Sequence, residues 1–214
     1  KGWTPDGLLA ELNIAREIGP VPAVRGGAGQ AEKLLRRFLA DGLSRYDEHS
    51  SDPAANVASH LSPYLHFGQI SPLQIALAVR REGARCPASR DAFLEQLIVR
   101  RELGMNFVWY NRRYDRFACL PEWARKTLRR HAADKRPVVY SLRQMESADT
   151  HDEYWNAAMR EMTLTGRMHN YMRMYWGKKI LEWSPSPREA FRRMLRLNNA
   201  YFLDGRDPNS YRSE

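Results

Sequence analysis

The chain has 214 residues, of which 43% are hydrophobic and 28% are charged, a composition typical of a globular protein with a core of its own. No apolar run approaches the ~20 residues that a membrane-spanning helix requires, so no membrane association is predicted. The two cysteines, Cys86 and Cys119, and the six histidines have neither ligand spacing nor the density of a disulfide scaffold, which predicts a reducing intracellular setting and no metal site.

Basic residues outnumber acidic ones by 34 to 25, which gives a formal net charge of +9. Arginines also occur in adjacent pairs along the chain, from Arg36-Arg37 to Arg192-Arg193. Such an excess indicates a polyanionic partner, bound through phosphate contacts that weaken as salt rises. The alternative is that these side chains cover solvated helix faces, and the sequence does not decide whether the charge converges on one surface.

Residues 1–30 are predicted to form a linker or extended segment, because their apolar patches are short and Pro and Gly are dense. Helical spacing of apolar residues begins at Ala31 and continues to Leu43. We therefore predict one helical domain over residues 31–214. Since the chain begins with Lys1 instead of Met, we expect it to be part of a longer protein.

The rest of the chain shows helical patterns separated by short breaks, with no alternating strand pattern, so the predicted fold is all-α. Ser62-Pro63 and Ser71-Pro72 are typical helix starts, with Ser as the cap and Pro in the first turn. Such a start can also hold a phosphate, although most are only caps. Later helices are predicted at 72–82, 90–110, 121–131, 141–148, 151–164, 166–183 and 187–199, followed by a turn-rich tail at 203–211.

Residues 166–183 are rich in aromatic side chains and Met, with two tryptophans, two tyrosines and three methionines. Trp176 and Trp183 share one face of the predicted helix, with Cα atoms roughly 10 Å apart along its axis. Arg173 lies one turn before Trp176. Aromatic and Met stripes at helical spacing usually indicate core packing. A packed core helix and a functional helix face are the two interpretations that remain open.

Four stretches together resemble the class II DNA photolyases. Residues 59–71 are similar to the flavin-phosphate segment of that family, 94–103 to its substrate-pocket helix, 167–183 to its flavin-facing helix and 203–209 to the partner loop of that helix. The resemblance runs in order from about Ala31 to Asn209. His60 departs from it, because the family usually has Asn there.

The resemblance implies the helical FAD-binding domain of the photolyase/cryptochrome family. Members repair cyclobutane pyrimidine dimers in DNA with FAD and blue light, as a deoxyribodipyrimidine photo-lyase. The family has an α/β antenna domain before this helical domain and a Trp-containing segment after the position of Tyr211, so both are expected to be absent here and activity to be weak or lost. An antenna chromophore is expected only in the full-length parent, which would be a monomer acting on DNA inside the cell.

The resemblance also assigns residues to the cofactor. Arg173 and Asp204 would pair beside the isoalloxazine ring, where a buried cation stabilises the anionic reduced flavin. Asn198 would face flavin N5, with a simple helix C-cap as the alternative. Four residues would hold the FAD phosphates through side-chain hydroxyls and backbone N–H groups: Tyr46, Ser59, Leu61 and Ser62.

Glu102 is implied as the catalytic residue that hydrogen-bonds the flipped dimer, with Asn106 and Met174 lining its pocket. Dimerised bases stack poorly, so flipping them costs less than flipping normal bases. The alternative for Glu102 is a surface ion pair, because it follows two arginines.

The tryptophans are implied to carry an electron to the photoexcited flavin, with Trp176 nearest, Trp155 as the relay and Trp183 outermost. Trp3, Trp109 and Trp123 are assigned to packing. Two rival functions remain: a photolyase-like photoreceptor that signals without repair, and a basic helical module that binds nucleic acid without chemistry.

Overall fold

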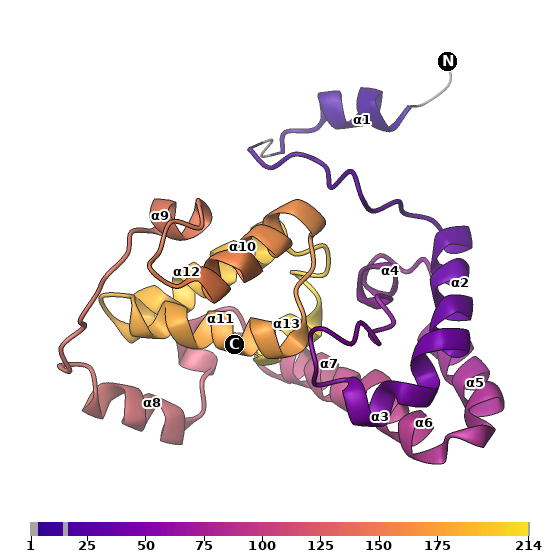
Figure 1. Cartoon of the computed structure of the whole chain (residues 1–214). Helices are drawn as coiled ribbons and strands as arrows, with labels where there is room; N and C mark the ends of the chain where they lie inside the picture. Colours follow the sequence, from indigo (N-terminus) through magenta and orange to yellow (C-terminus); the bar gives the residue numbers. More distant parts are fainter. Residues whose placement is uncertain (1–3, 15–16, 214) are drawn as a thin grey trace.

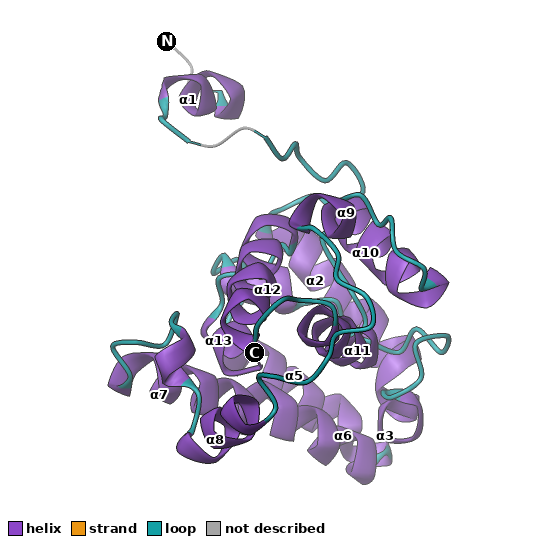
Figure 2. Cartoon of the chain, turned by 90° about the vertical axis from the view of Figure 1, so that its left-hand side faces the viewer, coloured by secondary structure: helices purple, strands orange, loops and turns teal. Residues whose placement is uncertain are grey.

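The computed structural model describes residues 4–14 and 17–213. Every regular element in these ranges is a helix, which confirms the predicted all-α fold (Figure 2). Short 3₁₀ turns occupy Leu43–Arg45, Gly83–Arg85 and Phe117–Cys119, and π-helices occupy Phe38–Gly42 and Glu95–Arg100. The α-helices are α1 (Pro5–Glu11), α2 (Ala28–Arg37), α3 (Tyr46–His49), α4 (Ser62–His66), α5 (Pro72–Glu82), α6 (Pro87–Leu94), α7 (Arg101–Tyr110), α8 (Glu122–Arg130), α9 (Leu142–Glu146), α10 (Glu153–Thr165), α11 (Asn170–Glu182), α12 (Pro187–Tyr201) and α13 (Pro208–Ser213).

The helices form two groups, each around its own apolar core (Figure 1). The first core joins α2 to α6 through side chains such as Leu35, Ile75 and Phe93. The second joins α9 to α12 around Met159 and Ile180. Burying side chains of this kind contributes roughly 1.5–3 kcal/mol each. The site described below lies where these two groups face each other.

Polar caps fix where several helices begin. The Ser71 hydroxyl accepts the Leu73 N–H at 3.2 Å at the start of α5. The Asp152 carboxylate accepts the Trp155 N–H at 2.9 Å at the start of α10. Each cap satisfies one of the backbone N–H groups that have no partner inside the helix. The Ser71 cap confirms the predicted helix start at Ser71-Pro72.

The predicted helix over 90–110 is continuous but not uniform. It consists of the end of α6, the π-helix Glu95–Arg100 and α7. A π-helical turn accommodates an extra residue, which rotates all later side chains by about 100° relative to an unbroken α-helix. This rotation decides which residues of the helix reach the site.

Several predicted boundaries were wrong. Residues 1–30 contain α1 and the start of α2, and the turn-rich tail contains α13. Gly166 does not begin a helix, because it is the C-cap of α10 with a left-handed φ of 66°. Its added Cβ would lie 2.5 Å from Leu203, so both backbone and packing require glycine there. Ser62 is the first residue of α4 and Leu61 precedes it as the cap.

The assignment of two tryptophans to packing was also wrong. Trp109 is 80% exposed and Trp123 is 73% exposed. Trp3 lies outside the described residues. Within residues 4–14 and 17–213, no helix is long and apolar enough to cross a membrane.

Candidate functional site

A cavity of about 230 Å³ lies between the two helix groups. Its wall combines apolar side chains with hydroxyl, amide and charged groups, a mixture that suits a ligand with both aromatic and anionic parts. Segments that are far apart in the sequence form this wall: Tyr46, Ser59, Leu61, Ser62, Leu65, Ile75, Phe93, Gln96, Leu97, Arg101, Asn170, Arg173, Asp204, Asp207, Asn209 and Ser210.

Six of the seven residues predicted to bind the cofactor line this one cavity, namely Tyr46, Ser59, Leu61, Ser62, Arg173 and Asp204. They come from α3, the loop before α4, α4 itself, α11 and the loop before α13. Burial raises the pKa of Tyr46 above its ordinary value, so its hydroxyl remains protonated at neutral pH and can donate a hydrogen bond. The seventh residue, Asn198, lies behind the wall.

A sharp turn shapes the segment that precedes α4. Both Asn56 and His60 have left-handed φ angles, of 47° and 56°, and the His60 ring nitrogen lies 3.1 Å from the Asn56 side-chain oxygen. Burial and the nearby positive charge of Arg167 lower the pKa of His60, so the ring is neutral at pH 7. Asn tolerates this backbone conformation better than most residues. This is a physical reason why the family that the sequence resembles usually has Asn at the position of His60. The turn directs Ser59 and Leu61 to the cavity.

Arg173 is held from several sides. Its guanidinium donates to the side-chain oxygen of Asn198 and to the Ser210 hydroxyl, the latter at 3.3 Å. It lies 3.8 Å from an Asp204 carboxylate oxygen and stacks 3.9 Å above the centre of the Phe202 ring. The Arg173 and Asp204 side chains are only 22% and 17% exposed, so the predicted pair does form at the cavity wall.

Asn198 positions Arg173 and does not itself line the cavity. It is fully buried, and its amide nitrogen donates to the Gly205 carbonyl and to the Asn199 side chain. A Cβ at residue 205 would lie 2.1 Å from the Asn198 carbonyl oxygen, so only glycine allows this approach. Since α12 continues to Tyr201, the Asn198 side chain is not a helix C-cap.

The three predicted electron carriers form a buried aromatic group beside the cavity wall. Trp155, Trp176 and Trp183 are 0%, 1% and 1% exposed. The ring centres of Trp155 and Trp183 are 5.5 Å apart, and the Trp155 indole donates to the Trp176 carbonyl at 3.1 Å. Trp176 in turn lies 6.3 Å from the Phe202 ring, on which Arg173 stacks. Contacts therefore run from Phe202 to Trp176, Trp155 and Trp183, and the order of electron transfer stays a prediction.

Trp183 ends this series without reaching the surface. Its ring is covered by Tyr140 and His151, each 5.3 Å away between ring centres. A Tyr140 hydroxyl also lies 2.6 Å from a His151 ring nitrogen. Trp176 and Trp183 pack in the second core, as the core interpretation of residues 166–183 expects, and their role in electron transfer stays a prediction.

The structure does not bring the three predicted substrate contacts to the cavity. The Glu102 side chain is 61% exposed, and an Arg101 guanidinium nitrogen lies 4.0 Å from its carboxylate. Met174 is 48% exposed, and Asn106 is exposed as well. The surface ion pair that was the alternative for Glu102 is thus what the structure shows, in a weak form.

The π-helix explains this difference. It turns Gln96, Leu97 and Arg101 towards the cavity and places Glu102 on the solvent side. The apolar spacing in the sequence fits an unbroken α-helix, so it does not indicate this rotation. Gln96 and Arg101 were therefore missed, although both lie within the similar stretch 94–103.

The loop before α13 also supplies residues that the sequence did not single out. Asp207 lines the cavity and lies 3.6 Å from a His66 ring nitrogen, which joins this loop to α4. Asn209 and Ser210 of α13 complete the wall. No group of three metal-ligating side chains occurs among residues 4–14 and 17–213.

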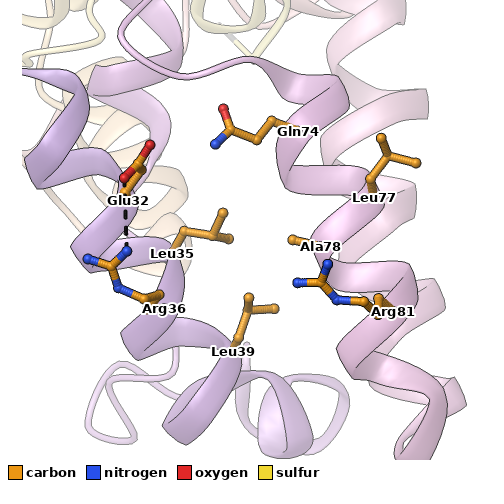
Figure 3. A pocket seen from close by; sticks show the side chains of 8 residues that line it. All are labelled: Glu32, Leu35, Arg36, Leu39, Gln74, Leu77, Ala78 and Arg81. Carbon is orange, nitrogen blue, oxygen red and sulfur yellow. Dashed lines mark ion pairs between the residues drawn. The ribbon is translucent and has the colours of Figure 1, made fainter.

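A second, larger cavity of about 470 Å³ lies between α2 and α5 (Figure 3). Leu35 and Leu39 point into it, and the Glu32–Arg36 ion pair, 3.9 Å long, lies at its edge. None of the residues predicted to bind cofactor or substrate lines it. Its wall has no hydroxyl group, and its single carboxylate, Glu32, is paired with Arg36, so the first cavity is the candidate site.

The sequence was compared with known proteins. No protein-family model matches the chain. A deoxyribodipyrimidine photo-lyase of Methanothermobacter thermautotrophicus is 54% identical over 187 residues, which cover 87% of this chain and 41% of that protein. One from Oryza sativa subsp. japonica is 50% identical over 218 residues, covering 97% and 43%. A cryptochrome-2 of Arabidopsis thaliana is 30% identical over 164 residues, covering 69% and 24%.

A solved structure shares the fold. The crystal structure of a bacterial class III photolyase from Agrobacterium tumefaciens matches with a TM-score of 0.68 at 21% identity. The match covers 91% of this chain and 40% of that one, which confirms the predicted type of helical domain. The chain spans about two fifths of the relatives that it matches, with 41% and 43% for the first two named above.

Proposed function

Because this chain belongs to the photolyase/cryptochrome family, we propose that it is the flavin-binding helical part of a class II DNA photolyase. In this proposal the parent protein splits cyclobutane pyrimidine dimers in DNA with blue light. One observation carries it: six residues assigned to FAD binding, taken from segments that span Tyr46 to Asp204, line a single cavity. Class II in particular rests on the four similar stretches of sequence.

The residues of the cavity fit FAD. Arg101 and Arg173 supply positive charge for an anionic ligand, Tyr46 and the Ser59–Ser62 segment supply hydrogen-bonding groups, and Phe93 supplies an apolar wall. The volume of about 230 Å³ is below the ~300 Å³ lower end of typical ligand pockets, so a cofactor as large as FAD would extend beyond it. When bound, FAD would supply light absorption and electron transfer.

Arg173 would hold positive charge beside the flavin ring. Asn198, Asp204 and Phe202 fix its guanidinium, so little reorganisation is needed when negative charge appears next to it. A single carboxylate at 3.8 Å only partly compensates the guanidinium. We infer that this residue favours the anionic reduced state of the cofactor.

We infer that Gln96 contacts the flipped dimer in addition to, or in place of, the predicted Glu102, Asn106 and Met174. Of these four, only Gln96 lines the cavity. Its amide can donate to a thymine carbonyl and accept from a ring N–H, which matches both kinds of edge group on the base. Unlike a carboxyl group, it does so without changing protonation.

Three measurements in sequence test the function. A yellow preparation with the absorption of flavin shows cofactor binding. The FAD-loaded protein is then illuminated with blue light and reductant in the presence of a dimer-containing oligonucleotide, and restored thymines are counted. Restored thymines support the proposal, whereas photoreduction without them supports the photoreceptor. A colourless protein that takes up no FAD supports the nucleic-acid-binding module.

A further inference from the structure

Aromatic rings stand out into solvent at the end of α7 and on α8. Trp109 and Tyr110 are each 80% exposed, and Trp123 is 73% exposed. None of the three lines the cavity between the two cores. Large aromatic side chains left in water are unfavourable unless they have a partner, and exposed rings near positive charge are a feature of surfaces that bind nucleic acid.

The same part of the chain concentrates the positive charge. Residues 109–136 contain nine Arg and Lys against three Asp and Glu, a difference of +6 within a total of +9. Glu122 binds Arg125 and Arg129, at 2.6 and 2.7 Å. Among the described residues, Lys126 and Arg130 form no ion pair and both are exposed. Their charges are therefore available to a partner.

The spacing of these residues brings ring and charges together. Trp123, Lys126 and Arg130 follow one another at intervals of three and four residues, so they project from one face of α8. Lys126 and Arg130 are about 6 Å apart along the helix axis, a separation from which two long side chains reach neighbouring phosphates of a strand. We call Trp123, Lys126 and Arg130 the α8 face.

The segment before α8 is anchored to the second core. The Phe117 ring contacts Phe191 of α12 at 6.0 Å between ring centres, and Arg188 stacks 4.9 Å from the centre of Phe117. α8 itself has no buried residue and lies at the edge of the molecule (Figure 1). The anchor holds a helix whose outer side is free to contact a large partner.

We propose that the α8 face binds a DNA strand, with Lys126 and Arg130 on phosphates and Trp123 stacked on a base. Arg112 and Arg113, which are exposed and follow Trp109-Tyr110 after one residue, extend the basic surface. The inference rests on the proposed function for the identity of the polyanion as DNA. It adds a strand contact outside the cavity, which supplies affinity without reading sequence.

The test compares matched variants of the FAD-loaded protein. Lys126→Gln with Arg130→Gln is paired with Lys33→Gln with Arg80→Gln, which removes two exposed cations from α2 and α5. We expect the α8 double variant to bind a dimer-containing single strand more weakly and to lower the slope of log K against log salt by about 1.4, for two lost phosphate contacts. Trp123→Ala is expected to weaken binding about tenfold, whereas Tyr154→Ala, at an equally exposed ring, leaves it unchanged.

Two further arms separate the possible failures. Repair of a free thymine-dimer dinucleotide, too short to reach α8, is expected to survive in the α8 variants. Absence of repair in every variant, with binding still reduced, would remove the proposed function and keep the DNA-binding surface. If the α8 variants bind DNA as tightly as the control variants do, the α8 face is not a DNA-binding surface. The DNA assignment is overturned also if the α8 substitutions weaken binding of poly-L-glutamate as much as binding of DNA.

Discussion

The most constrained side chain of the site is Arg173, since its neighbours fix both its position and its charge. Substituting Arg173 by Ala removes the cation that faces the cavity and leaves Asp204 without its partner. We expect the flavin potential to fall by about 30 mV, which corresponds to roughly 1.4 kcal/mol for a two-electron couple. A redox titration of the FAD-loaded variant measures this.

Arg173→Lys is the matched control for charge. It keeps one positive charge but loses the planar stacking on Phe202 and the fork that reaches Asn198 and Ser210. We expect a flavin potential between those of the wild-type protein and Arg173→Ala. A potential unchanged in Arg173→Ala would exclude an electrostatic role for this residue.

Trp176 is the indole that approaches the cavity wall through Phe202. Trp176→Phe keeps a buried aromatic ring but replaces indole by a group that is far harder to oxidise. We expect FAD to remain bound and photoreduction to be lost, as followed by the flavin spectrum under blue light. Trp123→Phe, at an exposed indole outside the buried group, is the control. Photoreduction of the Trp176→Phe protein at the wild-type rate would remove the electron route.

Gln96 and Glu102 offer a direct comparison on one helix. We expect Gln96→Ala to lower repair of dimer-containing DNA about tenfold or more, because a buried hydrogen-bonding group of the base loses its partner. Glu102→Ala is expected to change repair less than twofold, since Glu102 does not line the cavity. Steady-state repair rates for both variants, at equal FAD content, decide between them. The opposite ranking would restore the residue predicted from the resemblance.

At the scale of the elements, apolar periodicity and Ser-Pro starts were sufficient to predict most helices. Ser71, for example, caps α5 as its sequence context indicates. The π-helix at Glu95–Arg100 was not predictable in the same way, because its extra residue leaves no mark on local composition. The resulting rotation leaves Glu102 and Asn106 on the exposed side of α7, away from the cavity.

Helices α7 and α13 approach each other closely beside the cavity wall. Gly104 of α7 is buried, and an added Cβ would lie 2.9 Å from the Asn209 Cα. Because that neighbour is backbone, Gly104→Ala must push α13 away. We expect a loss of about 1–3 kcal/mol in the free energy of unfolding and weaker FAD binding.

Gly177→Ala supplies the control for this change. Gly177 also lies inside a helix, but its added Cβ would meet only the Met194 sulfur at 3.5 Å, an ordinary contact. Alanine is the better helix former, so stability is expected to stay equal or rise by up to about 1 kcal/mol. Urea unfolding of both variants measures the difference, and equal stability of the two would show that α13 adapts without cost.

At the scale of the whole molecule, the cavity joins two cores that each pack separately. One side contributes Tyr46 and Phe93 and the other contributes Arg173, so a bound cofactor contacts both helix groups at once. A ligand that binds only the assembled state stabilises it by about 2.7 kcal/mol at a concentration of 100 times Kd. For a chain of this size, that corresponds to a rise in Tm of about 5–10 °C.

Calorimetry with and without FAD tests this coupling. The two cores are expected to unfold in separate or broadened transitions without the cofactor, and in one sharper transition with it, because FAD then holds both groups together. Arg173→Ala should reduce the shift in Tm, whereas the exposed substitution Tyr154→Ala should leave it intact. If FAD raised the stability of one transition and left the other unchanged, the cofactor would contact a single helix group, and a cavity formed jointly by both cores would be wrong.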